Sequence, residues 1–309
     1  MLKIKDLKKS FKNVKALKGI SFEVNKGEIF GLLGPNGAGK TTAISILTTL
    51  IEPDSGSVFY NEKSVFNNPG WWKKKIGVVP QEIAFYEELT PKDNLVLWAS
   101  LYGMNKKEAL ERADYLLELM GLSQKKRTKV SEFSGGMKRR LNIAIGIIHK
   151  PEILFLDEPT VGIDVHARVN IREILKEFSK EGMSMIYTTH QLDEAEELCD
   201  RIAIMDEGEI KAKGNLKELI SLIGEEIYIE FKGNFINSMK INNLLKNIEV
   251  KIHKLSDSST VMGVKNEEII PVVVEIFMKN NIRIDSMDIK RPNLETLFLK
   301  LTGKDLREE

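Results

Sequence analysis

The chain has 309 residues, 42% of them hydrophobic and 29% charged, which suits a globular protein with a sizeable core and about two domains. Its 46 Lys and Arg residues nearly balance 45 Asp and Glu residues, and a net charge of +1 argues against a general nucleic-acid binder. The single cysteine, Cys199, cannot form an internal disulfide, which fits a reducing compartment.

Neither a signal peptide nor a membrane span is expected. Residues 1–10 alternate Lys with apolar residues and contain no apolar core of the signal-peptide kind. The longest apolar stretches, residues 141–148 and 269–278, are shorter than the roughly 20 residues that a spanning helix needs. We therefore expect that the chain does not cross a membrane by itself.

Residues 1–220 are interpreted as one α/β domain. Short, continuous apolar runs at 28–33, 153–156 and 185–189 are typical of parallel strands buried on both faces. Helical periodicity lies between them, and residues 91–145 are predicted to form a helical insert, with Pro91 in its first turn. The prediction is a largely parallel core sheet with a helical subdomain.

Residues 221–309 are interpreted as a small C-terminal α+β domain. Strand patterns at 227–231, 248–252, 260–264 and 282–289 alternate with helical patterns at 239–245 and 267–278. The resulting order, β-α-β-β-α-β, is that of a ferredoxin-like fold. A last helix is predicted at 294–301, and we interpret the domain as an accessory or regulatory one.

The strongest motif fits G-x-x-x-x-G-K-[ST] between a predicted strand and a predicted helix. Glycines let main-chain N–H groups surround phosphate oxygens, and the N-terminus of the helix adds positive potential. In such a loop Lys40 binds the β- and γ-phosphates, and the Thr41 hydroxyl ligates Mg²⁺. The alternative is a glycine-rich turn that matches by chance. The motif consists of Gly34, Pro35, Asn36, Gly37, Ala38, Gly39, Lys40 and Thr41.

A second motif is the apolar run 153–156 followed by Asp157 and Glu158. A carboxylate at the carboxyl end of a buried parallel strand lies on the ligand-binding edge of the sheet. Asp157 can hold Mg²⁺ through water, and Glu158 can polarise a water that attacks the γ-phosphate. The alternative is a strand that ends in a solvated acidic turn.

The third motif, Ser134-Gly135-Gly136, precedes a basic and then apolar helical stretch. A serine and glycines at a helix start form an anion site, although an ordinary helix cap has the same pattern. Gln81, His190 and Phe11 are single candidates: Gln81 for Mg²⁺ or the attacking water, His190 for the γ-phosphate, and Phe11 for stacking on adenine. Each of the three is also compatible with a purely structural role.

Taken together, the order and spacing of these motifs across residues 1–220 resemble the nucleotide-binding domain of ABC transporters. The resemblance assigns the family's motifs as follows: Gly34–Thr42, ending in Thr41 and Thr42, as Walker A; Gln81 as the Q-loop; Ser134, Gly135 and Gly136 as the signature; 153–157 as Walker B; Glu158 as the catalytic glutamate; 161–164 with Asp164 as the D-loop; His190 as the switch histidine; Phe11 as the adenine-stacking aromatic.

The signature departs from the family's usual Leu-Ser-Gly-Gly-Gln, because Phe133 and Met137 occupy its outer positions. Ser-Gly-Gly-Met-Lys-Arg-Arg-Leu and the segment 292–303 are similar to the subset that powers ABC-2-type exporters of drugs, antibiotics or polysaccharides. This similarity implies export rather than import.

The resemblance implies an ATPase that uses ATP and Mg²⁺ and works as a homodimer with a separate transmembrane permease. Ser134, Gly135, Gly136 and Asp164 are then expected to contact the ATP held by the partner copy. The chain is expected in the cytoplasm, peripheral on the inner face of the cell membrane, with no nucleic-acid partner. Two alternatives remain: a soluble ABC ATPase acting on nucleic acid or ribosomes, and a nucleotide-regulated scaffold without enzymatic activity.

Overall fold

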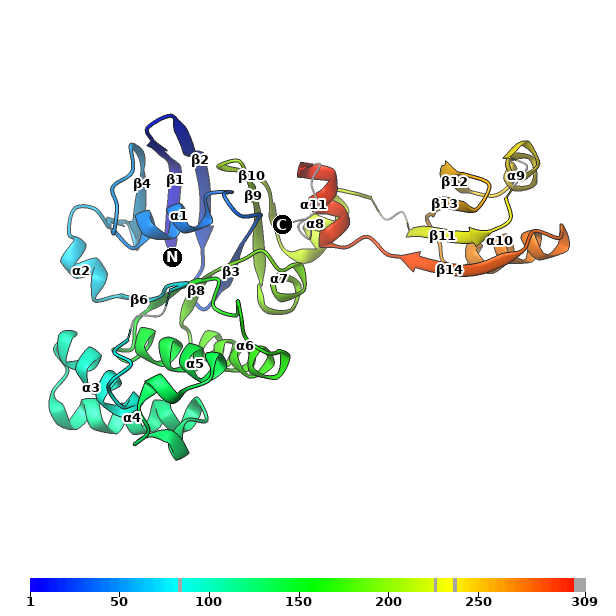
Figure 1. Ribbon diagram of the computed structural model, residues 1–309. Helices are drawn as coiled ribbons and strands as arrows, with labels where there is room; N and C mark the ends of the chain where they lie inside the picture. The colour runs from blue at the N-terminus through cyan, green and yellow to red at the C-terminus, as the bar shows by residue number, and fades with distance from the viewer. Residues whose placement is uncertain (83–84, 225–226, 236–237, 303–309) are drawn as a thin grey trace. The chain divides into compact units, whose positions relative to one another are not determined.

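A computed structural model describes residues 1–82, 85–224, 227–235 and 238–302 (Figure 1). Contacts divide the chain into a first unit, Met1–Asn215, and a second unit that begins at Leu216. The predicted boundary, between residues 220 and 221, falls inside helix α8, Leu216–Ser221.

The centre of the first unit is a six-stranded sheet with the order β10-β9-β3-β8-β7-β6. Five neighbouring strands are parallel, and only β10 runs antiparallel to its neighbour β9. Every residue of β3, β7 and β8 is buried, as the continuous apolar runs predicted. The strands are β3 (Ile29–Leu33), β6 (Ile76–Val79), β7 (Ile153–Asp157), β8 (Ser184–Thr189), β9 (Arg201–Asp206) and β10 (Glu209–Gly214).

A second, antiparallel sheet with the order β2-β1-β4-β5 was not anticipated from the sequence. Its strands are β1 (Leu2–Phe11), β2 (Val14–Val24), β4 (Ser55–Tyr60) and β5 (Lys63–Ser64). It shares a core with β3 and helix α1 (Lys40–Leu47), in which the rings of Phe22 and Phe30 stack with centroids 4.9 Å apart. Trp72, in α2 (Pro69–Lys73), completes this core and donates its indole N–H to the Leu47 carbonyl at 2.7 Å. Trp71 packs against the same core, so both tryptophans of α2 are packing residues.

The predicted helical insert is confirmed, and Figure 1 shows it on the opposite side of the central sheet from β1, β2 and β4. Its helices are α3 (Pro91–Leu101), α4 (Lys106–Leu119) and α5 (Gly135–Gly146), with short 3₁₀ turns at Ser123–Lys125 and Val130–Glu132. Thr90 and Asn105 cap α3 and α4 by accepting hydrogen bonds from main-chain N–H groups. Buried residues of these helices share one core with α6 (Val165–Lys180) and α7 (Leu192–Leu198).

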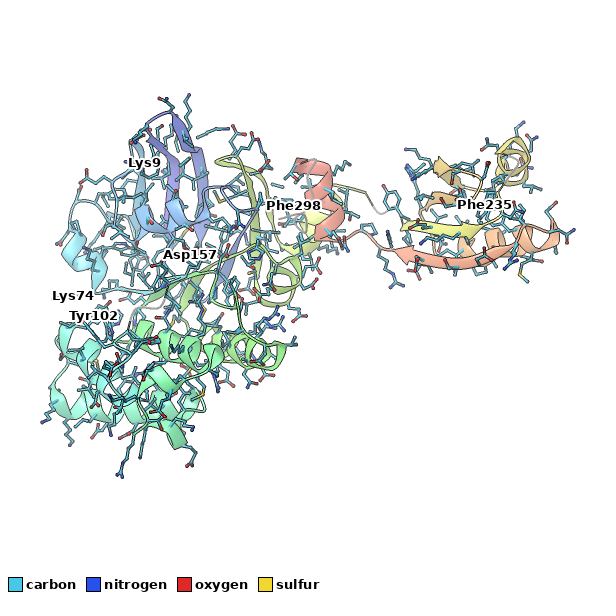
Figure 2. The ribbon with its side chains drawn as sticks, viewed as in Figure 1. Lys9, Lys74, Tyr102, Asp157, Phe235 and Phe298 are labelled. Carbon is cyan, nitrogen blue, oxygen red and sulfur yellow. The ribbon has the colours of Figure 1, made fainter. Side chains whose placement is uncertain are left out.

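The second unit contains the predicted β-α-β-β-α-β order. Its elements are β11 (Ile227–Gly233), α9 (Ser238–Leu245), β12 (Val250–Leu255), β13 (Ser259–Val264), α10 (Ile269–Lys279) and β14 (Ile284–Lys290). The four strands form an antiparallel sheet with the order β12-β13-β11-β14. Phe231, Phe235 and Phe277 meet edge to face in its core, and Figure 2 labels Phe235. Helices α8 and α11 (Leu294–Thr302) contact each other.

Across the described ranges of both units, no helix is both long and apolar enough to cross a membrane.

Candidate active site

The glycine-rich turn connects β3 to α1 with two glycines in left-handed conformations. Gly39, at φ +102°, precedes the first residue of α1, and a Cβ there would lie 2.6 Å from the Ala16 carbonyl oxygen. Gly37, at φ +78°, has no atom within 4 Å of the position of a Cβ. No side chain caps the N-terminus of α1, so its first N–H groups can serve an anion. The turn is therefore packed against Ala16 of β2 at Gly39 and has open space beside it at Gly37.

Lys40 lies at the end of this turn and is only 5% exposed. Its Nζ donates hydrogen bonds to the carbonyls of Gly34 at 2.8 Å and Pro35 at 3.1 Å. The same nitrogen is 3.2 Å from Oε1 of Glu158. The structure thus brings the first and second predicted motifs into direct contact.

Asp157 is the last residue of β7, and Glu158 comes directly after it. Strand β7 pairs with β8, and in this pairing Asp157 lies opposite Thr188. The Thr188 hydroxyl donates to Oδ1 of Asp157 at 2.6 Å and accepts the Glu158 N–H at 3.0 Å. Glu158 has a positive φ of 46°, unusual for a residue with a side chain. Figure 2 labels Asp157 within the first unit.

Glu158 also contacts the predicted histidine, since its Oε2 is 3.2 Å from Nδ1 of His190. This contact is the largest cause that lowers the pKa of Glu158, and the charge of Lys40 acts in the same direction. Glu158 in turn raises the pKa of His190, while burial opposes that rise. The arrangement favours an ionised glutamate beside a protonated histidine.

A pocket of about 420 Å³ opens in front of these groups. Its lining includes eight of the predicted residues: Asn36, Gly37, Gly39, Lys40, Thr41, Thr42, Gln81 and Glu158. Five further lining residues had not been singled out in the sequence: Val14, Lys15, Ala16, Lys18 and Glu207. They come from β2 and the β9–β10 turn, and no local motif marks them, because tertiary packing of Ala16 against Gly39 brings them there.

Phe11 lies 47% exposed at the β1–β2 turn, outside the lining of this pocket. The Nζ of Lys9 lies 5.6 Å from the centroid of its ring. Val14, on the other side of the same turn, does line the pocket and is also exposed. The apolar residues that line the pocket from this hairpin are Val14 and Ala16, and the stacking role of Phe11 stays a prediction.

Three predicted oxygen donors fit Mg²⁺ chemically, of which Thr41 and Gln81 line the pocket and Asp157 lies outside its lining. The Thr41 hydroxyl, the Gln81 amide and the Asp157 carboxylate all offer oxygen, which Mg²⁺ prefers. Within the described ranges, no group of three or more His, Cys, Asp and Glu side chains is arranged to hold a metal. Such a sparse donor set suits an ion that takes further ligands from phosphate and water.

The predicted signature lies apart from this pocket but adjoins the predicted D-loop. Ser134 caps α5 by accepting the Met137 N–H at 3.4 Å, and Asp164 caps α6 by accepting the Ala167 N–H at 2.9 Å. A Cβ on Gly136 would lie 3.5 Å from Oδ2 of Asp164. None of Ser134, Gly135, Gly136 and Asp164 lines the pocket, and Ser134, Gly135 and Asp164 are exposed.

A buried hydroxyl network, missed in the sequence, lies beneath the catalytic segments. Oε2 of Glu194, in α7, accepts hydrogen bonds from Thr160 at 2.8 Å, Tyr187 at 3.0 Å and Thr189 at 3.1 Å. Thr160 comes two residues after Glu158, and Thr189 directly precedes His190. Glu194 therefore ties the two segments that carry the glutamate and the histidine.

Another pocket, of about 480 Å³, opens at the amino ends of β7 and β8 and includes Lys26, Glu152 and Ser184. It contains none of the predicted site residues. Because ligands of parallel α/β sheets bind at the carboxyl ends of the strands, we assign the chemistry to the pocket that contains Lys40 and Glu158.

Known proteins resemble this chain over its whole length. A family model described as ABC transporter matches residues 17–161. The linearmycin resistance ATP-binding protein LnrL of Bacillus subtilis (strain 168) is 42% identical over 311 residues, covering 100% of both chains. The doxorubicin resistance ATP-binding protein DrrA of Mycobacterium tuberculosis (strain ATCC 25618 / H37Rv) is 37% identical over 93% of this chain and 88% of that one.

The fold matches solved ATP-binding cassettes as well. The dimeric cassette MJ0796, in a post-hydrolysis state with ADP and Pi, superposes with a TM-score of 0.65 at 26% identity, covering 70% of this chain and 98% of that one. The alternative of an ABC ATPase acting on nucleic acid or ribosomes finds no support in these relatives. The chain belongs to the ABC transporter ATP-binding family, as an ATPase subunit homologous to those of drug exporters.

Proposed function

We propose that this subunit hydrolyses ATP with Glu158 as the general base. The observation that carries the proposal is that one carboxylate lies 3.2 Å from Lys40 and 3.2 Å from His190, at the edge of the pocket formed by the glycine-rich turn. A lowered pKa keeps that carboxylate ionised, as a base acting on water requires.

The roles of the other residues follow from where they lie. Hydrolysis of a phosphoanhydride depends mainly on positioning and on neutralising charge. Lys40 and the N–H groups of residues 34–42 would bind the phosphates, and Glu158 would orient or deprotonate the attacking water. His190 would stabilise the γ-phosphate. Mg²⁺, held by Thr41, Gln81 and Asp157, would offset the charge of the phosphate oxygens.

We further propose that a second copy completes each site. Ser134, Gly135 and Asp164 are exposed, Gly136 lies beside Asp164, and all four lie outside the pocket of their own chain. The N-terminus of α5 offers main-chain N–H donors that suit an anion. ATP would therefore draw two copies together, and hydrolysis would separate them.

The transport step is proposed to take place in a separate membrane permease, contacted near Gln81 and the helical insert. Export is favoured because two relatives are named for resistance to linearmycin and doxorubicin. The subunit would then lie in the cytoplasm, peripheral on the inner face of the membrane. The second unit would tune pairing with the permease or with the second copy.

Glu158→Gln tests the catalytic assignment. The amide keeps the size of the side chain but cannot act as a base, so turnover should fall about 10²- to 10⁴-fold while ATP binding persists. Glu209→Gln, an exposed residue of β10 outside the pocket, is the matched control and should leave turnover unchanged. Turnover of Glu158→Gln within about tenfold of the wild type would sink the assignment.

Ser134→Tyr tests the shared site. A bulky side chain there should block both dimerisation and hydrolysis while the ATP affinity of the single copy changes little. Size-exclusion runs with and without ATP, alongside turnover at several protein concentrations, give the readout, most clearly in the Glu158→Gln background. A strictly monomeric protein whose specific activity does not depend on concentration would refute the shared site.

A further inference from the structure

Arg139, on helix α5, occupies a buried cage of main-chain carbonyls. Its side chain is only 4% exposed. Nη1 donates to the carbonyls of Pro80 at 2.9 Å and Gln81 at 3.1 Å, directly after strand β6. Nη2 donates to the carbonyls of Glu158 and, at 3.5 Å, Asp157, and Nε donates to that of Pro159. One guanidinium thus joins the signature helix to the Q-loop and to the catalytic glutamate.

The position of the Arg139 side chain depends on how the carbonyls of this cage are arranged. Every hydrogen bond that the described part of the chain gives the guanidinium goes to a carbonyl oxygen. Burial lowers the pKa of Arg139, against the nearby negative charges of Asp157 and Glu158. A buried cation is tolerated only where its donors are satisfied, so Arg139 favours the arrangement that presents all five carbonyls together.

Glu158 depends on this arrangement because its own backbone is strained. Its φ of 46° lies in the left-handed region, which costs free energy for any residue with a Cβ. Its N–H is held by Thr188 and its carbonyl by Arg139. With both peptide groups fixed, the side chain reaches Lys40 and His190.

We propose that Arg139 is a positioning residue for hydrolysis. It keeps Glu158 in its strained conformation and links that conformation to the places of Gln81 and helix α5. The carboxylate is therefore correctly aimed only while the signature helix is seated against β6 and β7. The inference rests on the proposed role of Glu158 as the base.

Arg139→Gln removes the guanidinium group, whose nitrogens reach both the segment after β6 and the segment at the end of β7. We expect kcat to fall about 10- to 100-fold, the range for releasing a strained backbone at a functional residue. The affinity for ATP should stay within about threefold, because Arg139 lies outside the lining of the nucleotide pocket. Arg139→Lys keeps the charge without the guanidinium group and should also lower kcat.

Arg140→Gln is the matched control. Arg140 is the next residue of the same helix, but its Nη1 donates at 2.8 Å to the carbonyl of Met120, within the helical insert. Its replacement should leave kcat within about threefold of the wild type. If Arg139→Gln does not fold, as judged by circular dichroism, Arg139→Lys carries the same comparison.

A double-mutant cycle separates positioning from a general structural role. In the Glu158→Gln background the base is already absent, so Arg139→Gln should change the residual single-turnover rate by less than about threefold. Equal losses in the two backgrounds, or a kcat for Arg139→Gln within threefold of the wild type, would overturn the inference. Full turnover by Glu158→Gln alone would instead refute the proposed function, so the two failures are distinguishable.

Discussion

Gly39 and Gly37 provide a paired test of how the glycine-rich turn is built. Both have positive φ, +102° and +78°, so an alanine at either position carries the cost of a left-handed conformation, about 1–2 kcal/mol. Only at Gly39 would the new Cβ also meet a main-chain atom, the Ala16 carbonyl oxygen at 2.6 Å. The Leu17 side chain lies 2.9 Å from the same position. The backbone carbonyl cannot rotate away without disturbing strand β2.

The difference between the two substitutions isolates the steric contribution. Gly37→Ala should lower the free energy of unfolding by about 1–2 kcal/mol. Gly39→Ala should lower it by about 2–5 kcal/mol, because overpacking typically adds about 1–3 kcal/mol. Urea unfolding followed by tryptophan fluorescence reports the first unit alone, since Trp71, Trp72 and Trp98 all lie in it. Equal losses for the two variants would refute the packing of the turn on Ala16.

Four further outcomes are expected. Glu158→Gln should lower the pKa of His190 in an NMR titration, because the carboxylate that raises it is gone, while the signal of His149, whose Nε2 donates to the Ile76 carbonyl, should not move. The contact between Glu158 and His190 should stabilise the fold below the ordinary imidazole pKa, and this contribution should disappear as pH rises through the raised pKa of His190. A difference in the free energy of unfolding between wild type and Glu158→Gln that grew over that pH range would contradict the pairing. Trp72→Ala should cost about 3–5 kcal/mol in urea unfolding, whereas the partly exposed Trp71→Ala should cost clearly less. A chain that ends at Asn215 should bind ATP within about tenfold of the full chain in a calorimetric titration, since the pocket lies wholly in the first unit; a larger loss would show that the second unit supports it.

The sequence predicted the elements with strong periodicity and the residues that belong to compact motifs. Residues 153–157 form a buried parallel strand because their apolar run leaves no solvated face, and Asp157 at its end, followed by Glu158, then lies at the ligand-binding edge. The contact of Glu158 with Lys40 and His190 follows from this arrangement, since three motifs end at neighbouring strands. The C-terminal sheet could be predicted equally well, because alternating apolar residues such as Ile229 and Phe231 form its buried face.

Residues that act through long-range packing could not be found in this way. The sheet of β1, β2, β4 and β5 has register shifts along β1, and its pairings join residues that are up to about 60 positions apart. In the sequence Arg139 is one residue of a basic run. Only the structure shows that it is buried among main-chain carbonyls at the ends of β6 and β7. Phe11 was the natural aromatic candidate at the first hairpin, whereas no motif pointed to Val14, Lys15 and Ala16, which line the pocket from that hairpin.

The network around Glu194 also contributes to the protonation of its neighbour His190. Glu194 is buried, and its negative charge acts on His190 in the direction that retains the imidazole proton. Arg139 is a buried positive charge, and its attraction to Glu158 favours the carboxylate form. These two buried charges of opposite sign thus both favour an ionised Glu158 beside a protonated His190. A proton taken from water by Glu158 would arrive at a group whose surroundings favour releasing it, which prepares the glutamate for the next turnover.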